Sequence, residues 1–327
     1  MRRHFAKAVV ASVTALAVVF GSGVAAVQAA PNNKARLVSK RWIGKQLMEV
    51  KVYSPSMEKV VTNQVMTPKN LKRAPVFYLL SGMYGGDGDQ WAHPAAHARK
   101  FFQKKNVYVV NPIGAASTYY TDWYFRDARL GYKPMWETYL TKELPPVINK
   151  VFKTTGRNAI AGYSMSGGTA LALLAHHGNL YHAGASYSGC PVSANPAMQW
   201  FIMVSMVLNT PGVMPLNAYG GFLSPAVFHN SPTANLSKLR GKKVFVSASL
   251  GKPGMPPDDH DMTGRIDKSA IEFGAYICTA VFDQLARSSG VNVEFYKQDA
   301  GAHSFGQFGA AMKKSWPMIA RALHTRV

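Results

Sequence analysis

Ser164 has the sequence surroundings of a catalytic nucleophile. It is the central residue of segment 162–166 (GYSMS), which follows a strand-like apolar run and precedes an Ala- and Leu-rich, helix-like segment at 169–177. In the G-x-S-x-G elbow, a sharp strand-to-helix turn projects the serine hydroxyl above a sheet, and the helix dipole stabilises a developing oxyanion. Ser166 replaces the last glycine of the motif, and Gly167 follows directly. The context favours a nucleophile over a serine that only caps an ordinary turn.

A serine nucleophile needs a base, and His303 is the candidate. It follows the last predicted strand, at residues 291–296, where the chain order Ser, acid, His of an α/β-hydrolase places its histidine. The alternative is a loop histidine on a basic surface, which suits most of the other nine histidines better. His260 lies in an acidic loop, where a solvated surface cluster is more typical than a metal site.

Two places along the chain offer the acid that would orient this histidine. One is the loop with Asp258, Asp259 and Asp261, which follows a predicted strand. The other is Glu272, near the start of a predicted helix that stops at Gly290. The apolar stripe of that helix consists of Ile271, Ala275, Cys278, Phe282 and Leu285. Residues 269–272 also match a capping box, in which Glu272 only bonds backbone. From these residues alone the acid stays open.

Short apolar runs between longer helix-like segments indicate how these residues are positioned. The predicted strands cover residues 76–80, 107–110, 158–161, 183–187, 244–248 and 291–296. Their apolar runs are continuous, as in strands buried on both faces of a mostly parallel sheet. Residues 46–53 alternate in polarity and predict an antiparallel strand near the N-terminus. The expected fold class is α/β and doubly wound, with helices flanking a central sheet.

Residues 198–209 (MQWFIMVSMVLN) are apolar around nearly the whole circumference of a helix. Such a helix must be buried or face lipid, and it is too short to span a bilayer. It falls between two predicted strands, in the region where α/β-hydrolases commonly insert a cap over the nucleophile. We expect a helical insertion over the active site whose methionines contact long acyl chains. Ordinary core packing is an equal alternative.

The first thirty residues have the order of a secretory signal peptide. A basic start with Arg2, Arg3 and Lys7 precedes a short apolar run, and residues 27–29 form a small-x-small cleavage site. No later stretch has about 18 consecutive apolar residues, as a membrane span would require. We therefore expect a signal peptide at residues 1–30 and a single catalytic domain at residues 31–327.

The composition describes a basic protein with a large apolar core. Hydrophobic residues make up 47% and charged residues 16%, which excludes disordered and coiled-coil proteins. Lys and Arg outnumber Asp and Glu by 37 to 16, and loss of residues 1–30 leaves 34 against 16, or +18. This charge attracts anionic partners of any kind. Outside the cell we expect an anionic wall polymer or membrane surface, and no nucleic acid.

Two cysteines, Cys190 and Cys278, remain in the mature chain. An oxidising compartment favours a single disulfide between them, and two separate buried thiols are the alternative. No Cys and His spacing fits a zinc site, so we expect no metal.

Several segments, in the same order along the chain, resemble the secreted mycolyltransferases of mycobacteria and corynebacteria, which have the α/β-hydrolase fold. The segments are residues 78–83 (YLLSGM), 119–124 (YYTDWY), 136–138 (WET), 164–168 (SMSGG) and 303–304 (HS). The resemblance implies Ser164 as nucleophile, Glu272 as acid and His303 as base. It also implies that the backbone N–H groups of Met83 and Met165 form the oxyanion hole.

The chain departs from this family at positions that line the family's sugar site. Ser81 and Tyr84 stand where mycobacterial members have an Asp and an Arg, and Phe305 stands where many have a Trp. These departures put the acceptor in question rather than the acyl chemistry. The expected substrate contacts are Tyr84, Ser304, Phe305, Trp200 and Met203.

The reaction that the resemblance implies is mycolyl transfer during assembly of the cell envelope. Trehalose monomycolate would acylate Ser164, and a second sugar hydroxyl would then accept the mycolyl group, forming trehalose dimycolate or arabinan mycolate. A glycolipid donor and a sugar acceptor are the expected partners, and no cofactor is needed. Two alternatives remain: a secreted carboxylesterase with the same triad, and a wall-binding protein on an inactive scaffold.

Overall fold

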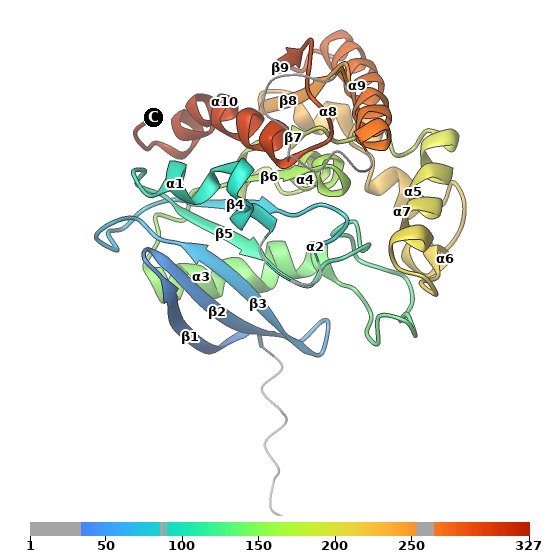
Figure 1. Ribbon diagram of the computed structural model, residues 1–327. Helices are drawn as coiled ribbons and strands as arrows, with labels where there is room; N and C mark the ends of the chain where they lie inside the picture. Colours follow the sequence, from blue (N-terminus) through green and yellow to red (C-terminus); the bar gives the residue numbers. More distant parts are fainter. Residues whose placement is uncertain (1–33, 86–87, 89, 253–264) are drawn as a thin grey trace, which may run out of the picture. The chain divides into compact units, whose positions relative to one another are not determined.

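A nine-stranded mixed sheet forms the centre of the computed structural model, which describes residues 34–85, 88, 90–252 and 265–327 (Figure 1). The strands are Arg36–Gly44 (β1), Leu47–Ser54 (β2), Lys59–Met66 (β3), Val76–Leu80 (β4), Tyr108–Pro112 (β5), Asn158–Tyr163 (β6), Tyr181–Tyr187 (β7), Lys243–Ser249 (β8) and Val293–Gln298 (β9). They lie in the order β1-β2-β3-β5-β4-β6-β7-β8-β9. The pairs β1–β2, β2–β3 and β3–β5 are antiparallel, and the pairs from β5–β4 to β8–β9 are parallel.

The parallel part of the sheet contains the six strands that the apolar runs predict. β4 to β8 are mostly buried on both faces, as continuous apolar sequence requires. β9 corrects this expectation, because it lies at the edge of the sheet and only Val293 of its six residues is fully buried. β2 confirms the antiparallel strand predicted at residues 46–53. β1 and β3 are not predicted. Every residue of β1 is exposed, so this strand has no apolar periodicity from which it could be recognised.

Helices cover both faces of the sheet and enclose two separate cores. The α-helices are Ala98–Phe102 (α1), Trp136–Thr138 (α2), Leu144–Phe152 (α3), Met165–His176 (α4), Pro196–Asn209 (α5), Pro215–Tyr219 (α6), Pro225–His229 (α7), Leu236–Leu239 (α8), Arg265–Ser288 (α9) and Phe305–Leu323 (α10). Phe77 and Leu79 of β4 pack in one core with α1 and α10. Tyr78 and Leu80 point the other way, into a core with α3, α4 and α9.

The predicted insertion lies between β7 and β8 and contains α5 to α8, of which α5 to α7 gather at one side of the sheet in Figure 1. Asn195 caps α5, because its Oδ1 accepts hydrogen bonds from the amides of Ala197 and Met198. Shorter helical turns are Gln90–Ala92, Pro94–Ala96, Tyr139–Glu143 and Pro232–Asn235. The α/β class with a helical insertion is therefore confirmed.

Three predictions fall outside the described residues. They are the signal peptide at residues 1–30, the acidic loop with Asp258, Asp259 and Asp261, and His260. Within the described ranges, no helix is long and apolar enough to cross a membrane.

Candidate active site

Ser164 lies in the turn between β6 and α4, in a strained backbone conformation with φ 52° and ψ −119°. Its amide donates to the carbonyl of Tyr187 on the neighbouring strand, at 2.9 Å, and this bond helps to hold the turn. Gly162 is required here, because a Cβ at this position would lie 2.6 Å from the carbonyl oxygen of Ser166. The elbow predicted from the sequence therefore forms, with its serine at the start of a helix.

Ser166 replaces the second glycine of the motif without disturbing the turn. Its hydroxyl is fully buried and donates to the carbonyl of Tyr163 at 3.1 Å. The close backbone approach falls instead on Gly167, where a Cβ would lie 2.9 Å from the Cα of Gly189. The glycine that packing requires is thus one residue later than in the usual motif.

Ser164, His303 and Glu272 form one continuous hydrogen-bonded chain. The Nε2 atom of His303 lies 2.8 Å from Ser164 Oγ, and its Nδ1 atom lies 2.8 Å from Glu272 Oε2. The Glu272 side chain is fully buried, and that of His303 is 13% exposed. This is the arrangement of a nucleophile, a base and an acid that orients the base. The residues come from the β6–α4 turn, the loop before α10, and α9.

The second carboxylate oxygen of Glu272 also has defined partners. Oε1 accepts hydrogen bonds from the Ser188 hydroxyl at 2.8 Å and from the Ser249 amide at 2.9 Å. The sequence reasoning missed both serines. Ser188 follows directly after β7, and Ser249 is the last residue of β8. Their position could have identified them, because polar residues at the carboxyl ends of parallel strands commonly belong to the functional site.

The capping-box alternative for Glu272 is wrong. Helix α9 begins at Arg265, so Glu272 lies two turns inside it rather than in its first turn. The predicted apolar stripe is also partly wrong, because Ile271 and Leu285 are both more than 40% exposed. The buried residues of α9 include Glu272, Ala275, Cys278, Thr279, Phe282 and Ala286. Two of these buried residues, Glu272 and Thr279, are polar, so a prediction based only on apolar residues assigned the wrong face of the helix to the core.

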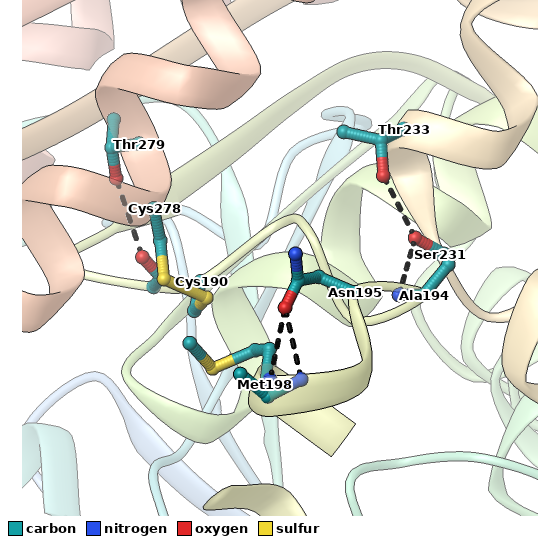
Figure 2. Close-up of a disulfide and its surroundings, with 10 residues drawn as sticks. Cys190, Ala194, Asn195, Met198, Ser231, Thr233, Cys278 and Thr279 are labelled. Atoms are coloured by element: carbon teal, nitrogen blue, oxygen red, sulfur yellow. Dashed lines mark hydrogen bonds between the residues drawn. A yellow bond between two sulfur atoms is a disulfide. The ribbon is translucent and has the colours of Figure 1, made fainter. Parts of the chain in front are cut away.

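A disulfide between Cys190 and Cys278 joins α9 to the segment that follows β7 (Figure 2). The two Cα atoms are 4.9 Å apart. Beside the bridge, the Thr279 hydroxyl donates to the carbonyl of Gly189 at 3.3 Å. The predicted disulfide is therefore confirmed, and it anchors the helix that carries Glu272 less than two turns away.

The position of His303 is set by its backbone and by an aromatic neighbour. Its amide donates to the carbonyl of Lys268 on α9 at 3.1 Å, and its ring packs edge to face with that of Phe308, with 5.0 Å between centroids. The next residue, Ser304, is buried and caps α10 by accepting from the Gln307 amide at 3.4 Å. This gives Ser304 a structural role; its predicted contact with substrate stays a prediction.

The register of the sheet sets side by side the two strand ends that precede the proposed oxyanion donors, Met83 and Met165. Leu80 of β4 pairs with Gly162 of β6, and Met83 and Met165 each follow their paired residue by three positions. Met165 is the first residue of α4, so its amide belongs to the helix N-terminus, where N–H groups have no partner within the helix. The Met83 carbonyl accepts from the Ser117 amide and from Asn209 Nδ2, at 3.1 and 3.2 Å.

The residues predicted to contact substrate differ in their surroundings. Tyr84 is 76% exposed, whereas Phe305 stacks on the ring of His93 with 4.3 Å between centroids. Trp200 is exposed and Met203 is half-buried, both on α5. Ser81, at the position where the resembling family has an Asp, is buried and donates to Asn111 Oδ1 at 3.1 Å. Its hydroxyl is therefore turned to the core rather than offered to a sugar.

A second titratable cluster lies at the other end of α4. Glu137 Oε1 is 2.7 Å from His177 Nε2, and Glu137 Oε2 is 2.9 Å from His229 Nε2. Burial alone would raise the pKa of Glu137, but the hydrogen bonds and charges of the two histidines outweigh it and lower that pKa to about 2. The bond to Glu137 raises the pKa of His229. Among the described residues, no cluster of His, Cys, Asp and Glu could hold a metal ion.

Curated proteins with similar sequences are acyltransferases by name. Diacylglycerol acyltransferase/mycolyltransferase Ag85A of Mycobacterium tuberculosis is 28% identical over 286 residues, which cover 84% of this chain and 80% of that protein. The corresponding Ag85C of Mycobacterium avium is 31% identical over 185 residues, or 54% of this chain and 51% of the relative.

Two solved structures have the same fold at low sequence identity. MPT51 (FbpC1) of Mycobacterium tuberculosis superposes with a TM-score of 0.69 at 23% identity and covers 83% of this chain and 96% of its own. An S-formylglutathione hydrolase from Agrobacterium tumefaciens gives a TM-score of 0.64 at 14% identity and covers 88% of this chain and 99% of its own. A family model described as "Putative esterase" matches residues 54–228, more than half of the chain. The chain therefore belongs to the Esterase family.

Proposed function

We propose that this protein is a serine acyltransferase that moves a mycolyl group from trehalose monomycolate to a second sugar hydroxyl. The observation that carries the proposal is the hydrogen-bonded chain from Ser164 through His303 to the buried carboxylate of Glu272. The choice of acyl group is supported by the relatives, whose names describe them as mycolyltransferases.

The chemistry starts with proton transfer from Ser164 to His303. As the serine oxygen attacks the ester carbonyl of the donor, His303 Nε2 accepts the hydroxyl proton, and Glu272 stabilises the imidazolium that forms. The amides of Met83 and Met165 would donate to the oxyanion of the tetrahedral intermediate. His303 then protonates the leaving trehalose oxygen, and a mycolyl ester remains on Ser164.

The second half of the reaction uses the same groups in reverse. His303 takes the proton of an acceptor sugar hydroxyl, the resulting oxygen attacks the acyl-enzyme, and Ser164 is released with its proton restored. Transfer rather than hydrolysis requires that water be kept from the acyl-enzyme. The two candidate acceptors are the free sugar hydroxyl of a second trehalose monomycolate, which gives trehalose dimycolate, and a hydroxyl of wall arabinan. The buried, bonded hydroxyl of Ser81 and the stacked ring of Phe305 indicate acceptor contacts that differ from those of the resembling family.

Product analysis tests this function against a carboxylesterase. The protein is incubated with trehalose monomycolate, with and without added trehalose, and the lipids are identified by mass spectrometry. A transferase moves the mycolyl group to a second monomycolate, so it produces trehalose dimycolate and free trehalose. Added trehalose should lower the amount of dimycolate, because it accepts the mycolyl group and returns it to monomycolate. Release of free mycolic acid alone, with no trehalose dimycolate in either sample, would overturn the proposal in favour of the esterase.

Active-site labelling distinguishes an active serine enzyme from a wall-binding protein on an inactive scaffold. A serine-directed phosphonate should modify Ser164 in the folded wild type and leave His303→Ala unmodified over the same time. Lack of any Ser164 adduct in folded wild-type protein would support the inactive binder.

The proposed setting is the cell envelope, reached after secretion. Residues 1–30 would be removed as a signal peptide, and residues 31–327 would form the mature catalytic domain. The charge of +18 that then remains, 34 basic residues against 16 acidic, suits an anionic wall or membrane surface.

A further inference from the structure

One long part of the chain contains no charged side chain. Between Arg157 and Lys238 lie 80 residues without a single Asp, Glu, Lys or Arg, although such residues make up 16% of the sequence. At that average the stretch would contain about thirteen. The first half includes β6, α4 and β7, which are buried, so charges are not expected there. The second half includes α5, α6 and α7, which lie at the surface.

The surface of this second half is densely apolar. Its large exposed side chains are Trp200, Phe201, Val204, Val207, Leu208, Met214, Leu216, Phe222, Leu223 and Phe228. Each is between 42% and 77% exposed. Single exposed apolar residues are ordinary, but these ten lie on or between helices that contact one another, α5 with α6 and α6 with α7, and such a gathering marks an interaction site. We call these ten residues the apolar surface.

Specific contacts hold this surface together. The rings of Trp200 and Phe222 lie 6.3 Å apart, and Gln199 Oε1 accepts from the Leu223 amide at 2.9 Å. Buried Asp127 accepts from the Met214 amide at 3.0 Å and from Asn217 Nδ2 at 2.9 Å. The exposed side chains therefore project from a fixed framework in which α5 and α6 are joined.

Helix α5 has one buried face and one exposed face, and both carry large apolar side chains. Gln199, Ile202 and Met206 face the core, whereas Phe201 and Leu208 are 54% and 77% exposed. The core-packing alternative for residues 198–209 is therefore wrong for the outward face. A helix of 14 residues is about 21 Å long, too short to cross a bilayer, so its outward face suits a position along the surface of one.

The apolar surface adjoins the proposed oxyanion loop. Asn209, the last residue of α5, donates through Nδ2 to the carbonyl of Met83 at 3.2 Å. Earlier in the same helix, the hydroxyl of Ser205 is 2.9 Å from that of Tyr119. A lipid layer on this surface would thus lie beside the groups proposed to receive its acyl ester.

We propose that the apolar surface docks on an anionic lipid layer and inserts its side chains among the acyl chains. This rests on the proposed function and adds how the enzyme meets its lipid substrate. Exposed arginines border the surface: Arg129 Nε donates to the carbonyl of Pro211, just after α5, at 3.1 Å, and Arg126 lies on the same loop. Their charge complements anionic head groups, whereas a second copy of this chain would bring the same strong positive charge.

The test compares two double variants that leave the charge unchanged. Phe201→Ser/Leu208→Ser removes two side chains of the apolar surface, and Trp42→Ser/Leu71→Ser removes two that are 54% and 49% exposed elsewhere. Protein secreted by an expression host is mixed with vesicles of equal parts phosphatidylcholine and phosphatidylglycerol, and the bound fraction is measured by sedimentation. We expect at least tenfold weaker binding for Phe201→Ser/Leu208→Ser and a change below twofold for the control.

Two further measurements make the outcome decisive. Hydrolysis of a soluble short-chain ester should stay within twofold of wild type in both variants, which reports folding and the triad separately from docking. If the wild-type protein itself does not hydrolyse the soluble ester, the proposed function is contradicted, but the docking proposal is not. Equal vesicle binding by wild type and Phe201→Ser/Leu208→Ser would overturn the docking proposal. So would a wild-type dimer in solution that this variant converts to monomer, since the surface would then bind a second copy.

Discussion

At the scale of single residues, the buried carboxylate of Glu272 is the most constrained group of the site. It has no exposed surface and accepts hydrogen bonds from Ser188, Ser249 and the His303 ring. A buried carboxylate is stable only where partners replace its hydration. These donors also fix which way the carboxylate points, and so they position the imidazole against Ser164.

The change Glu272→Gln tests the orienting role. The amide keeps the size of the side chain but cannot stabilise an imidazolium, so we expect kcat for ester cleavage to fall on the order of 10²–10⁴-fold with the fold preserved. Circular dichroism checks the fold. The matched control is Ser269→Ala, which alters the other half of the rejected capping box and should change the rate less than twofold. A Glu272→Gln enzyme with near-normal turnover would contradict the assignment.

Glu137 predicts a pH dependence of stability that is separate from catalysis. Its pKa of about 2 lies below the ordinary value, so its contribution is complete above about pH 4.5 and is lost as the pH falls towards 2. The raised pKa of His229 acts in the opposite direction, and its contribution is lost as the pH rises through that value.

We therefore expect Glu137→Gln to lower the free energy of unfolding most near pH 5–6, on the order of 1–3 kcal/mol, and less at both lower and higher pH. Urea titrations at a series of pH values measure the difference. Glu58→Gln, at an exposed carboxylate, is the control and should give a flat profile. A profile for Glu137→Gln that is equally flat would show that the histidine pair does not hold this carboxylate.

At the scale of elements, α9 is the part whose placement matters most. It carries Glu272 on its buried face, and the Cys190–Cys278 bridge ties it to the segment after β7. We expect Cys190→Ser/Cys278→Ser to lose about 2–5 kcal/mol of stability, because the disulfide closes a loop across a sequence separation of 88.

Loss of the bridge should also lower kcat more than it raises KM, since it loosens the helix that orients His303. Chemical denaturation and steady-state kinetics on a soluble ester measure the two effects. Thr279→Val, which removes a hydrogen bond beside the bridge but leaves the disulfide intact, is the milder comparison. If the variant without the bridge kept full stability and full kcat, the bridge would have no role in holding the site.

The sequence predicted those features that depend on a few neighbouring residues, and missed those that depend on contacts between distant segments. The strands β4 to β9 and the elbow at Ser164 follow from runs of a few residues, and all of them form. The strand β1 has no apolar face, so no periodicity could reveal it. Glu272 needed a family resemblance, because its partners Ser188 and Ser249 come from two other strands that only the folded sheet brings together.

The outward face of α5 shows a different limit. Its sequence is apolar on all sides, which predicts burial or contact with lipid but cannot choose between them. The choice depends on what packs against the helix. In the structure only one side meets the core, and the exposure of residues such as Leu208 follows from that packing rather than from the helix itself.

At the scale of the whole molecule, the parallel sheet brings the residues of the site together. Ser164 and His303 are 139 residues apart, and Glu272 precedes His303 by 31, yet all three meet at the carboxyl edge of β6 to β9. The uncharged surface of α5 to α7 adjoins the same edge through Asn209 and Met83. One end of the sheet thus holds both the proposed acyl-transfer site and the surface proposed to dock on lipid.

Acyl transfer through Ser164 is tested most directly by trapping the intermediate. The protein is mixed with trehalose monomycolate, quenched by acid within a turnover, digested, and analysed by mass spectrometry with and without added trehalose. We predict a mycolyl ester on the peptide that contains Ser164, formed while dimycolate accumulates from the donor alone, and no adduct in Ser164→Ala. Added trehalose should remove this ester, because it accepts the mycolyl group and regenerates monomycolate. Dimycolate formation by Ser164→Ala, or an acyl group carried on a different residue of the wild type, would contradict the mechanism.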